Sequence, residues 1–96
     1  PYYPYSYLNL GVMYIEAKAY KEAIKIFSAG IENNPEAASL YYNSACCYAQ
    51  LGKPQAALQN VLKSLEIYPE LVDFMKQDQE LDSIRELPEY QKEFGK

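Results

Sequence analysis

The chain has 96 residues, which is enough for one small domain. With 49% hydrophobic and 23% charged residues, its composition is that of an ordinary globular protein and not of a disordered chain. The formal net charge is -4, and an acidic chain gains little from neutralising phosphates, so nucleic acid is not an expected partner. Histidine is absent, which removes the usual general base near neutral pH and argues against an enzyme.

The two cysteines, Cys46 and Cys47, are adjacent. Neighbouring helical residues point about 100° apart, so a disulfide between them would be strained. A zinc site needs about four ligands and two more are missing, so we expect no metal, no cofactor and two small packed hydrophobic side chains. Without a disulfide framework the expected location is cytoplasmic. No apolar run approaches the ~18 residues of a membrane span, so no membrane association is expected.

The sequence repeats itself at an offset of 34 residues. The identical pairs are Tyr7 and Tyr41, Asn9 and Asn43, Tyr14 and Tyr48, Ala23 and Ala57, Glu32 and Glu66, Pro35 and Pro69, and Glu36 and Glu70. A period of this length is typical of stacked structural repeats. Because the chain opens with Pro1 and lacks an initiator methionine, we expect it to be a fragment of a longer protein.

Each repeat unit has the apolar spacing of two helices. In the first unit the two stripes are Tyr7, Leu10, Gly11 and Tyr14, and then Tyr20, Ala23, Ile24, Phe27 and Ile31. The second unit repeats them as Tyr41, Ser44, Ala45 and Tyr48, and then Ala57, Leu58, Val61 and Leu65. Small residues, with Gly11 opposite Ala23, are expected to let the two helices of the first unit approach closely.

Glycine and proline mark the helix ends. Gly52 ends the first helix of the second unit, because glycine adopts the left-handed conformation without steric cost, and Pro54 begins the next helix. Pro35 and Pro69 follow the second helix of each unit and stop it. Lys18 stands where Gly52 stands in the second unit, so the first turn is expected to be strained or differently shaped.

The pattern resembles the tetratricopeptide repeat (TPR), an aromatic-x2-Leu-Gly-x2-Tyr, Ala-x3-Phe and Pro series over 34 residues. The first unit, residues 4–37, supplies Tyr7, Leu10, Gly11, Tyr14, Ala23, Phe27 and Pro35. The second unit, residues 38–71, supplies Tyr41, Ser44, Ala45, Tyr48, Ala57, Val61 and Pro69. The resemblance implies an all-α fold, in which antiparallel helix-turn-helix repeats stack as a short right-handed α-solenoid. Tyrosine replaces the usual tryptophan in both units, and Ser44 replaces the usual leucine.

Residues 72–96 do not repeat again, and the chain becomes acidic there. Residues 1–69 carry five acidic and five basic side chains, whereas residues 70–96 carry eight acidic and four basic ones. The spacing predicts a short helix after Pro69 with Leu71, Phe74 and Met75 on its apolar side, a second near residues 79–86 capped by Asp78, and a third near 88–94. This segment resembles the helices that close groups of such repeats, and it would cover the last apolar face.

The resemblance also implies a non-catalytic interaction module that binds a peptide or protein surface in its concave groove. Carried over position by position, the groove would take Tyr5, Leu8, Asn9, Val12 and Glu16 from the first unit and Tyr42, Asn43, Cys46, Ala49 and Gln50 from the second. Lys76 and Gln77 would stand at the far rim. The keywords that follow are repeat scaffold and protein binding.

Two other hypotheses remain open. The chain could be the structural, capping end of a longer array, or it could self-associate through its first helix around Tyr3, Tyr5 and Tyr7. One subclass of the family clamps a C-terminal carboxylate with Lys, Arg and Asn side chains. Asn43 matches that set, but Leu8, Val12 and Asp73 occupy the other positions, so we expect no such clamp and expect Asn43 to bond a neighbouring backbone group.

Overall fold

The computed structural model describes residues 3–95, and within that range the regular structure is entirely helical. Four long helices come first: α1 (Pro4–Glu16), α2 (Tyr20–Asn33), α3 (Ala38–Gln50) and α4 (Pro54–Ile67). Four shorter elements follow: the 3-10 helix η1 (Pro69–Leu71), α5 (Val72–Gln77), the 3-10 helix η2 (Gln79–Glu86) and α6 (Pro88–Phe94). The predicted all-α fold of antiparallel hairpins is therefore confirmed.

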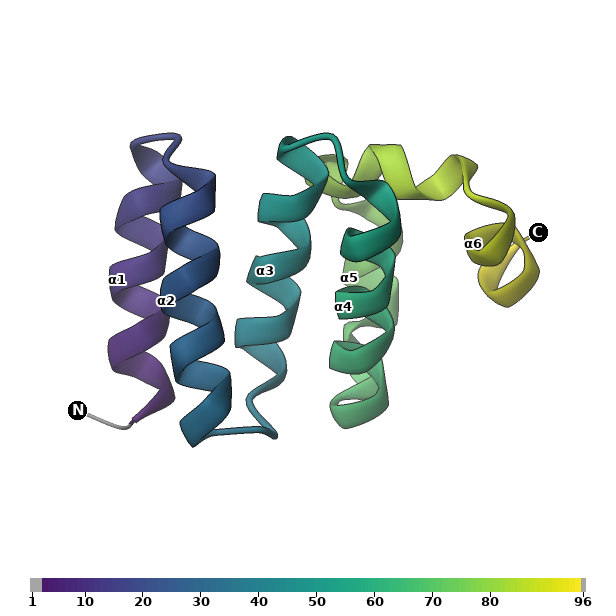
Figure 1. Cartoon of the computed structure of the whole chain (residues 1–96). Helices are drawn as coiled ribbons and strands as arrows, with labels where there is room; N and C mark the ends of the chain where they lie inside the picture. Colours follow the sequence, from purple (N-terminus) through teal and green to yellow (C-terminus); the bar gives the residue numbers. More distant parts are fainter. Residues whose placement is uncertain (1–2, 96) are drawn as a thin grey trace.

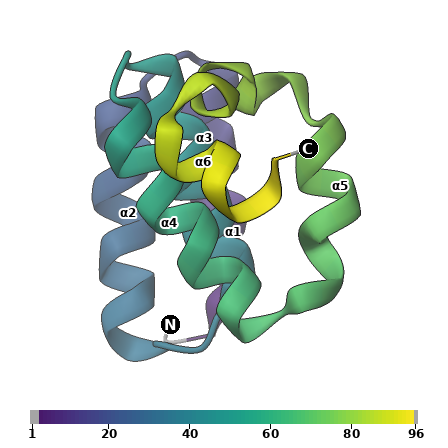
Figure 2. The ribbon, with the colours of Figure 1, turned by 90° about the vertical axis from the view of Figure 1, so that its right-hand side faces the viewer.

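The four long helices stand side by side, and each packs on the next along the chain (Figure 1). The tail passes behind α4 as α5, crosses the end of the stack as η2 and finishes in α6. Seen from the C-terminal end, α1 and α3 lie on the same side as α5, whereas α2 and α4 lie on the other (Figure 2). The first helix of each hairpin and α5 thus share one face of a molecule that measures 41 × 25 × 18 Å.

The turns inside the two hairpins have the same backbone geometry. The amide of Ala19 donates to the carbonyl of Tyr14 at 2.8 Å, and 34 residues later Lys53 donates to Tyr48 at 2.9 Å. Gly52 has a φ of 74°, and Lys18 has a φ of 60°. The predicted strain at Lys18 is therefore present as a left-handed backbone in a residue with a side chain.

The core consists of two clusters that meet at α3. The N-terminal cluster is formed by Ala23, Phe27, Leu40 and Cys47. The C-terminal cluster is formed by Tyr42, Ala45, Cys46, Ala57, Leu58, Val61, Met75, Leu81, Ile84 and Tyr90. The second hairpin and the tail thus share one core, and α3 links it to the first hairpin.

Two glycines allow close packing in the first hairpin. A Cβ atom on Gly11 would overlap the ring of Phe27, so Gly11 accommodates Phe27 and not Ala23 as the sequence predicted. A Cβ atom on Gly30 would lie 2.7 Å from the Cβ of Tyr7 and 2.8 Å from a methyl of Leu40. Gly30, which the repeat pattern did not single out, therefore lets α1 and α3 both press against α2.

The first predicted apolar stripe is only partly buried. Gly11 is buried and Tyr7 half-buried, but Leu10 and Tyr14 are exposed. Prediction of a fully packed stripe was wrong because α2 covers only one side of α1. In the second hairpin the equivalent side of α3 is packed against α2, which places Ser44 in the interior.

The tail helices lie where the spacing placed them. Asp78 caps η2, with its Oδ1 accepting the amide of Glu80 at 3.0 Å. Met75 is buried, but Phe74, predicted to pack beside it, is 61% exposed. Lys96, the last residue of the predicted segment 72–96, lies outside the described residues.

Candidate functional site

The α1 part of the predicted groove is available at the surface. Tyr5, Asn9 and Glu16 are exposed, and Leu8 and Val12 are half-buried. Leu8 also packs against the N-terminal cluster. These positions follow one another at helical spacing along one side of α1, and so present an uninterrupted strip in which polar groups alternate with apolar ones.

The α3 part is largely covered by the tail. Tyr42 is 7% exposed and Cys46 is 6% exposed, because both belong to the C-terminal cluster. Asn43 and Ala49 are half-buried, and Gln50 is exposed. Tyr42 and Cys46 are therefore core residues, and the sequence placed them in the groove because it did not show how closely the tail packs on α3.

Asn43 makes the backbone bond that its recurrence in both units suggested. Its Nδ2 donates to the carbonyl oxygen of Ser39 at 2.8 Å, one turn earlier in α3. The bond holds the amide of Asn43 in one orientation at a half-buried position. A fixed amide is well suited to contact an extended main chain, because little side-chain entropy is then lost on binding.

Tyr42 anchors the tail to α3. Its hydroxyl donates to Oδ2 of Asp78 at 2.6 Å, while Oδ1 of Asp78 caps η2. Burial raises the pKa of Tyr42 well above its usual range, and the bond to the Asp78 carboxylate raises it further. The phenol is therefore a permanently protonated donor whose role in this structure is to hold the tail in place.

Phe74 is a surface residue that the pattern missed. Its ring centroid lies 5.8 Å from that of Tyr42, at an angle of 48°, so Phe74 lies on α3 at the junction of α3 and α5. Lys76 and Gln77, the two predicted rim residues on the same short helix, are exposed as well. The spacing of Leu71, Phe74 and Met75 could not separate Phe74 from Met75, since both fit an apolar side of one helical turn.

The cysteines have no chemistry that the structure supports. Both are buried thiols without a disulfide. Burial raises the pKa of Cys47 to about 11 and raises that of Cys46 further, with the nearby Asp78 carboxylate adding to the second effect. Within residues 3–95 no three Cys, Asp or Glu side chains come together as metal ligands.

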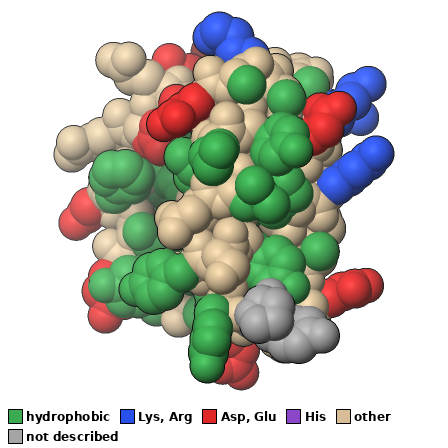
Figure 3. Space-filling view, turned by 90° about the vertical axis from the view of Figure 1, so that its left-hand side faces the viewer, with side chains coloured by type: hydrophobic (Ala, Val, Ile, Leu, Met, Phe, Trp, Pro, Cys, Tyr) green, Lys and Arg blue, Asp and Glu red, His purple; other side chains and the backbone are tan. Residues whose placement is uncertain are grey.

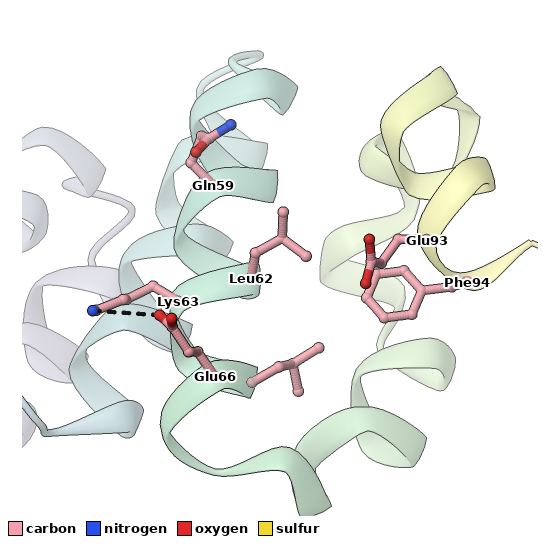
Figure 4. Close-up of a pocket in the computed structure, with 7 residues that line it drawn as sticks. Gln59, Leu62, Lys63, Glu66, Glu93 and Phe94 are labelled. Carbon is pink, nitrogen blue, oxygen red and sulfur yellow. Dashed lines mark ion pairs between the residues drawn. The ribbon is translucent and has the colours of Figure 1, made fainter.

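A second concave surface lies between α4 and α6 (Figure 4). The cleft has a volume of about 550 Å³, and Phe94 of α6 faces Leu62 and Leu65 of α4 across it. Its rim is charged, with Glu93 beside Phe94 and with Nζ of Lys63 3.4 Å from Glu66. The lining residues are Gln59, Leu62, Lys63, Leu65, Glu66, Glu93 and Phe94. The sequence did not indicate this cleft, because α6 has no counterpart in the repeat.

Comparison with known proteins identifies the class. A family model of the tetratricopeptide repeat matches residues 2–70, so the chain belongs to the tetratricopeptide repeat family. Proteins of this family use stacked helical hairpins of the kind described above. No solved structure matches this chain significantly.

The similar proteins are much longer than this chain. An Hsp70-Hsp90 organizing protein of Triticum aestivum is 40% identical over 50 residues, which are 52% of this chain and 9% of that protein. The Hsp70-Hsp90 organizing protein 3 of Arabidopsis thaliana is 34% identical over 56 residues, or 58% of this chain and 10% of that protein. A chloroplastic protein of Arabidopsis thaliana is 30% identical over 86 residues, or 86% of this chain and 26% of that protein.

None of the helices described between residues 3 and 95 has the length and apolar character needed to cross a bilayer. The expected cytoplasmic location stays a prediction, since one of the similar proteins is chloroplastic.

Proposed function

We propose that this chain is a non-catalytic protein-interaction module that binds an extended or helical peptide on the face shared by α1, α3 and α5. The observation that carries the proposal is the strip of exposed Tyr5 and Asn9 on α1, continued by Asn43 on α3 and by the exposed ring of Phe74 on α5. Aromatic anchors and oriented amides are the groups that hold a peptide through both its side chains and its main chain.

The rigidity of the face supports this function. The tail fixes α5 against α3 through Tyr42 and Asp78, so Phe74 stands on a braced support. Binding to a preformed surface avoids the entropy cost of ordering loops. The proposed mechanism is thus burial of apolar peptide side chains beside fixed polar groups, with no bond made or broken.

The partner class is narrower than the similar proteins would suggest. Two of them are named Hsp70-Hsp90 organizing proteins, and the family includes members that clamp a peptide's C-terminal carboxylate. Here Leu8, Val12 and Asp73 occupy positions where such a clamp needs cations and an amide. A carboxylate placed there would meet two apolar groups and a like charge, so we propose that an internal peptide segment is bound.

Peptides selected from a phage-displayed random library provide the test. Their affinity for the parent chain, measured by calorimetry, is expected to fall by roughly tenfold or more, about 1.4 kcal/mol, when Tyr5→Ala, Asn9→Ala and Phe74→Ala are combined. The matched control combines Lys25→Ala, Ser28→Ala and Glu32→Ala on the exposed side of α2. Loss of affinity in the control, or none in the first variant, would place the binding surface elsewhere.

The same peptides separate an internal segment from a clamped C terminus. Each is measured with a free C-terminal carboxylate and as the C-terminal amide. Equal affinity is expected, because no cation set for the carboxylate is present at Leu8, Val12 and Asp73. A strong preference for the free carboxylate would contradict this part of the proposal while leaving the α1, α3 and α5 face intact.

A further inference from the structure

The outer side of α1 carries a concentrated apolar patch at the N-terminal end of the molecule. Tyr3, Leu10, Met13 and Tyr14 are all exposed there, and Met13 is 63% exposed. The space-filling view of this end shows hydrophobic side chains gathered over the helix (Figure 3). No charged residue occurs in α1 before Glu16. A helix face that is apolar and uncharged over its whole length is costly to leave in water.

The repeat shows what this side of α1 is shaped to contact. Adding 34 to Ser6, Leu10 and Met13 gives Leu40, Ser44 and Cys47, which are buried in α3. Leu40 and Cys47 form the N-terminal cluster with residues of α2, and the chain of Gly30 in α2 runs close to Leu40. The outer side of α1 is therefore equivalent to a surface that a helix covers elsewhere in the same molecule.

This surface is also complementary to itself. Two copies of α1 laid antiparallel with their Leu10 side chains on a twofold axis bring positions equally distant from residue 10 together. Tyr3 then faces Ala17 of the other copy, and Ser6 faces Tyr14. Large side chains meet small ones on both sides of the axis, as helix packing requires, and no like charges oppose each other.

We propose that this chain forms a symmetric homodimer through the outer side of α1, with the two helices antiparallel and Leu10 on the axis. Tyr7 is excluded from the contact, because it is half-buried against Gly30, and Tyr5 lies on the side of α1 that faces the proposed peptide. The dimer thus leaves the peptide-binding strip open. One helix pair makes a small interface, which is typical of weak, transient association.

Sedimentation measures the association directly. The parent chain is expected to pass from monomer to dimer as its concentration rises from about 10 µM to about 500 µM, the range in which a small interface associates. Met13→Lys places a charge in the contact and is expected to remain monomeric over that range. Tyr68→Lys is the matched control: Tyr68 is 51% exposed at the end of α4, and this variant is expected to dimerise like the parent.

Cross-linking tests the geometry independently of stability. Cα atoms of facing helices can approach to roughly 4–5 Å, so Leu10→Cys is expected to form a disulfide across the axis under mild oxidation. Ser6→Cys lies on the same side of α1 but about 6 Å along the helix from the axis, and it is expected to stay uncrosslinked. Circular dichroism confirms that each variant is folded. A monomeric parent, a dimer unaffected by Met13→Lys, or preferential cross-linking at position 6 would each overturn the proposal.

Discussion

Lys18 holds a backbone conformation that normally belongs to glycine. Its φ of 60° matches the 74° of Gly52, and the same pair of backbone hydrogen bonds closes both turns. The repeat architecture imposes this turn on whatever residue stands there. A left-handed conformation costs a residue with a side chain about 1–2 kcal/mol, so the first hairpin is less stable than its sequence could make it.

Replacing Lys18 with glycine is therefore expected to stabilise the protein. Release of the left-handed strain outweighs the larger entropy of glycine in the unfolded chain by about 0.5–1 kcal/mol. Denaturant unfolding should show a higher midpoint with an unchanged slope. Lys18→Ala keeps the strain and is expected to be neutral. Gly52→Ala introduces the strain without a clash, since nothing lies within 4 Å of the added Cβ, and should destabilise. A lower midpoint for Lys18→Gly would contradict this account.

The residues that sequence reasoning placed correctly are those governed by the 34-residue period. Gly52, Pro54 and Pro69 mark helix ends by their own backbone geometry, which needs no tertiary information. Tyr42 and Phe74 were misplaced, because the exposure of each depends on how the tail lies across α3. The tail does not repeat, so no internal template for that contact exists in the sequence.

At the scale of elements, the tail is held by a single guanidinium. The side chain of Arg85 in η2 donates to the carbonyl oxygens of Met75 at 2.8 Å, Asp78 at 2.9 Å and Lys76 at 3.1 Å. Its remaining nitrogen donates to Oδ1 of Asp82 at 2.7 Å. The first and third of these carbonyls belong to the last turn of α5, where helix carbonyls lack partners within the helix. Arg85 thus joins α5 to η2.

Substitution of Arg85 by lysine is expected to loosen this joint although the charge is kept. An ammonium group is a compact point charge and cannot serve several carbonyls in a planar arrangement. The expected loss is about 1–3 kcal/mol, read from denaturant unfolding. Hydrogen exchange should show faster exchange of the amides of residues 75–86 and little change in α1 and α2.

The control for this substitution is Lys92→Gln in α6, which removes an exposed cation from the same tail and should leave both measurements unchanged. An Arg85→Lys variant as stable as the parent would mean that the carbonyl contacts contribute nothing beyond charge. Such a result would assign the stability of the tail to its apolar contacts through Leu81 and Ile84.

At the scale of the whole molecule, stability is divided between two cores that share one helix. Neighbouring cysteines in α3 report on different cores: Cys46 packs with Met75 and Ile84, whereas Cys47 packs with Phe27 and Leu40. Stacked repeats derive their stability from contacts with neighbouring units, so their ends can open separately. The two thiols give a direct measure of whether they do so here.

Single-cysteine variants, Cys47→Ala and Cys46→Ala, allow each thiol to be labelled alone with an aromatic disulfide reagent. Ile84→Val removes one buried methyl group from the C-terminal core, which costs about 1 kcal/mol and should raise the labelling rate of Cys46 roughly fivefold. Cys47 should keep its rate, because its neighbours are unchanged. Phe27→Leu should do the reverse, accelerating Cys47 with little effect on Cys46. If either substitution accelerates both thiols equally, α3 couples the two cores into one cooperative unit and their separate opening is disproved.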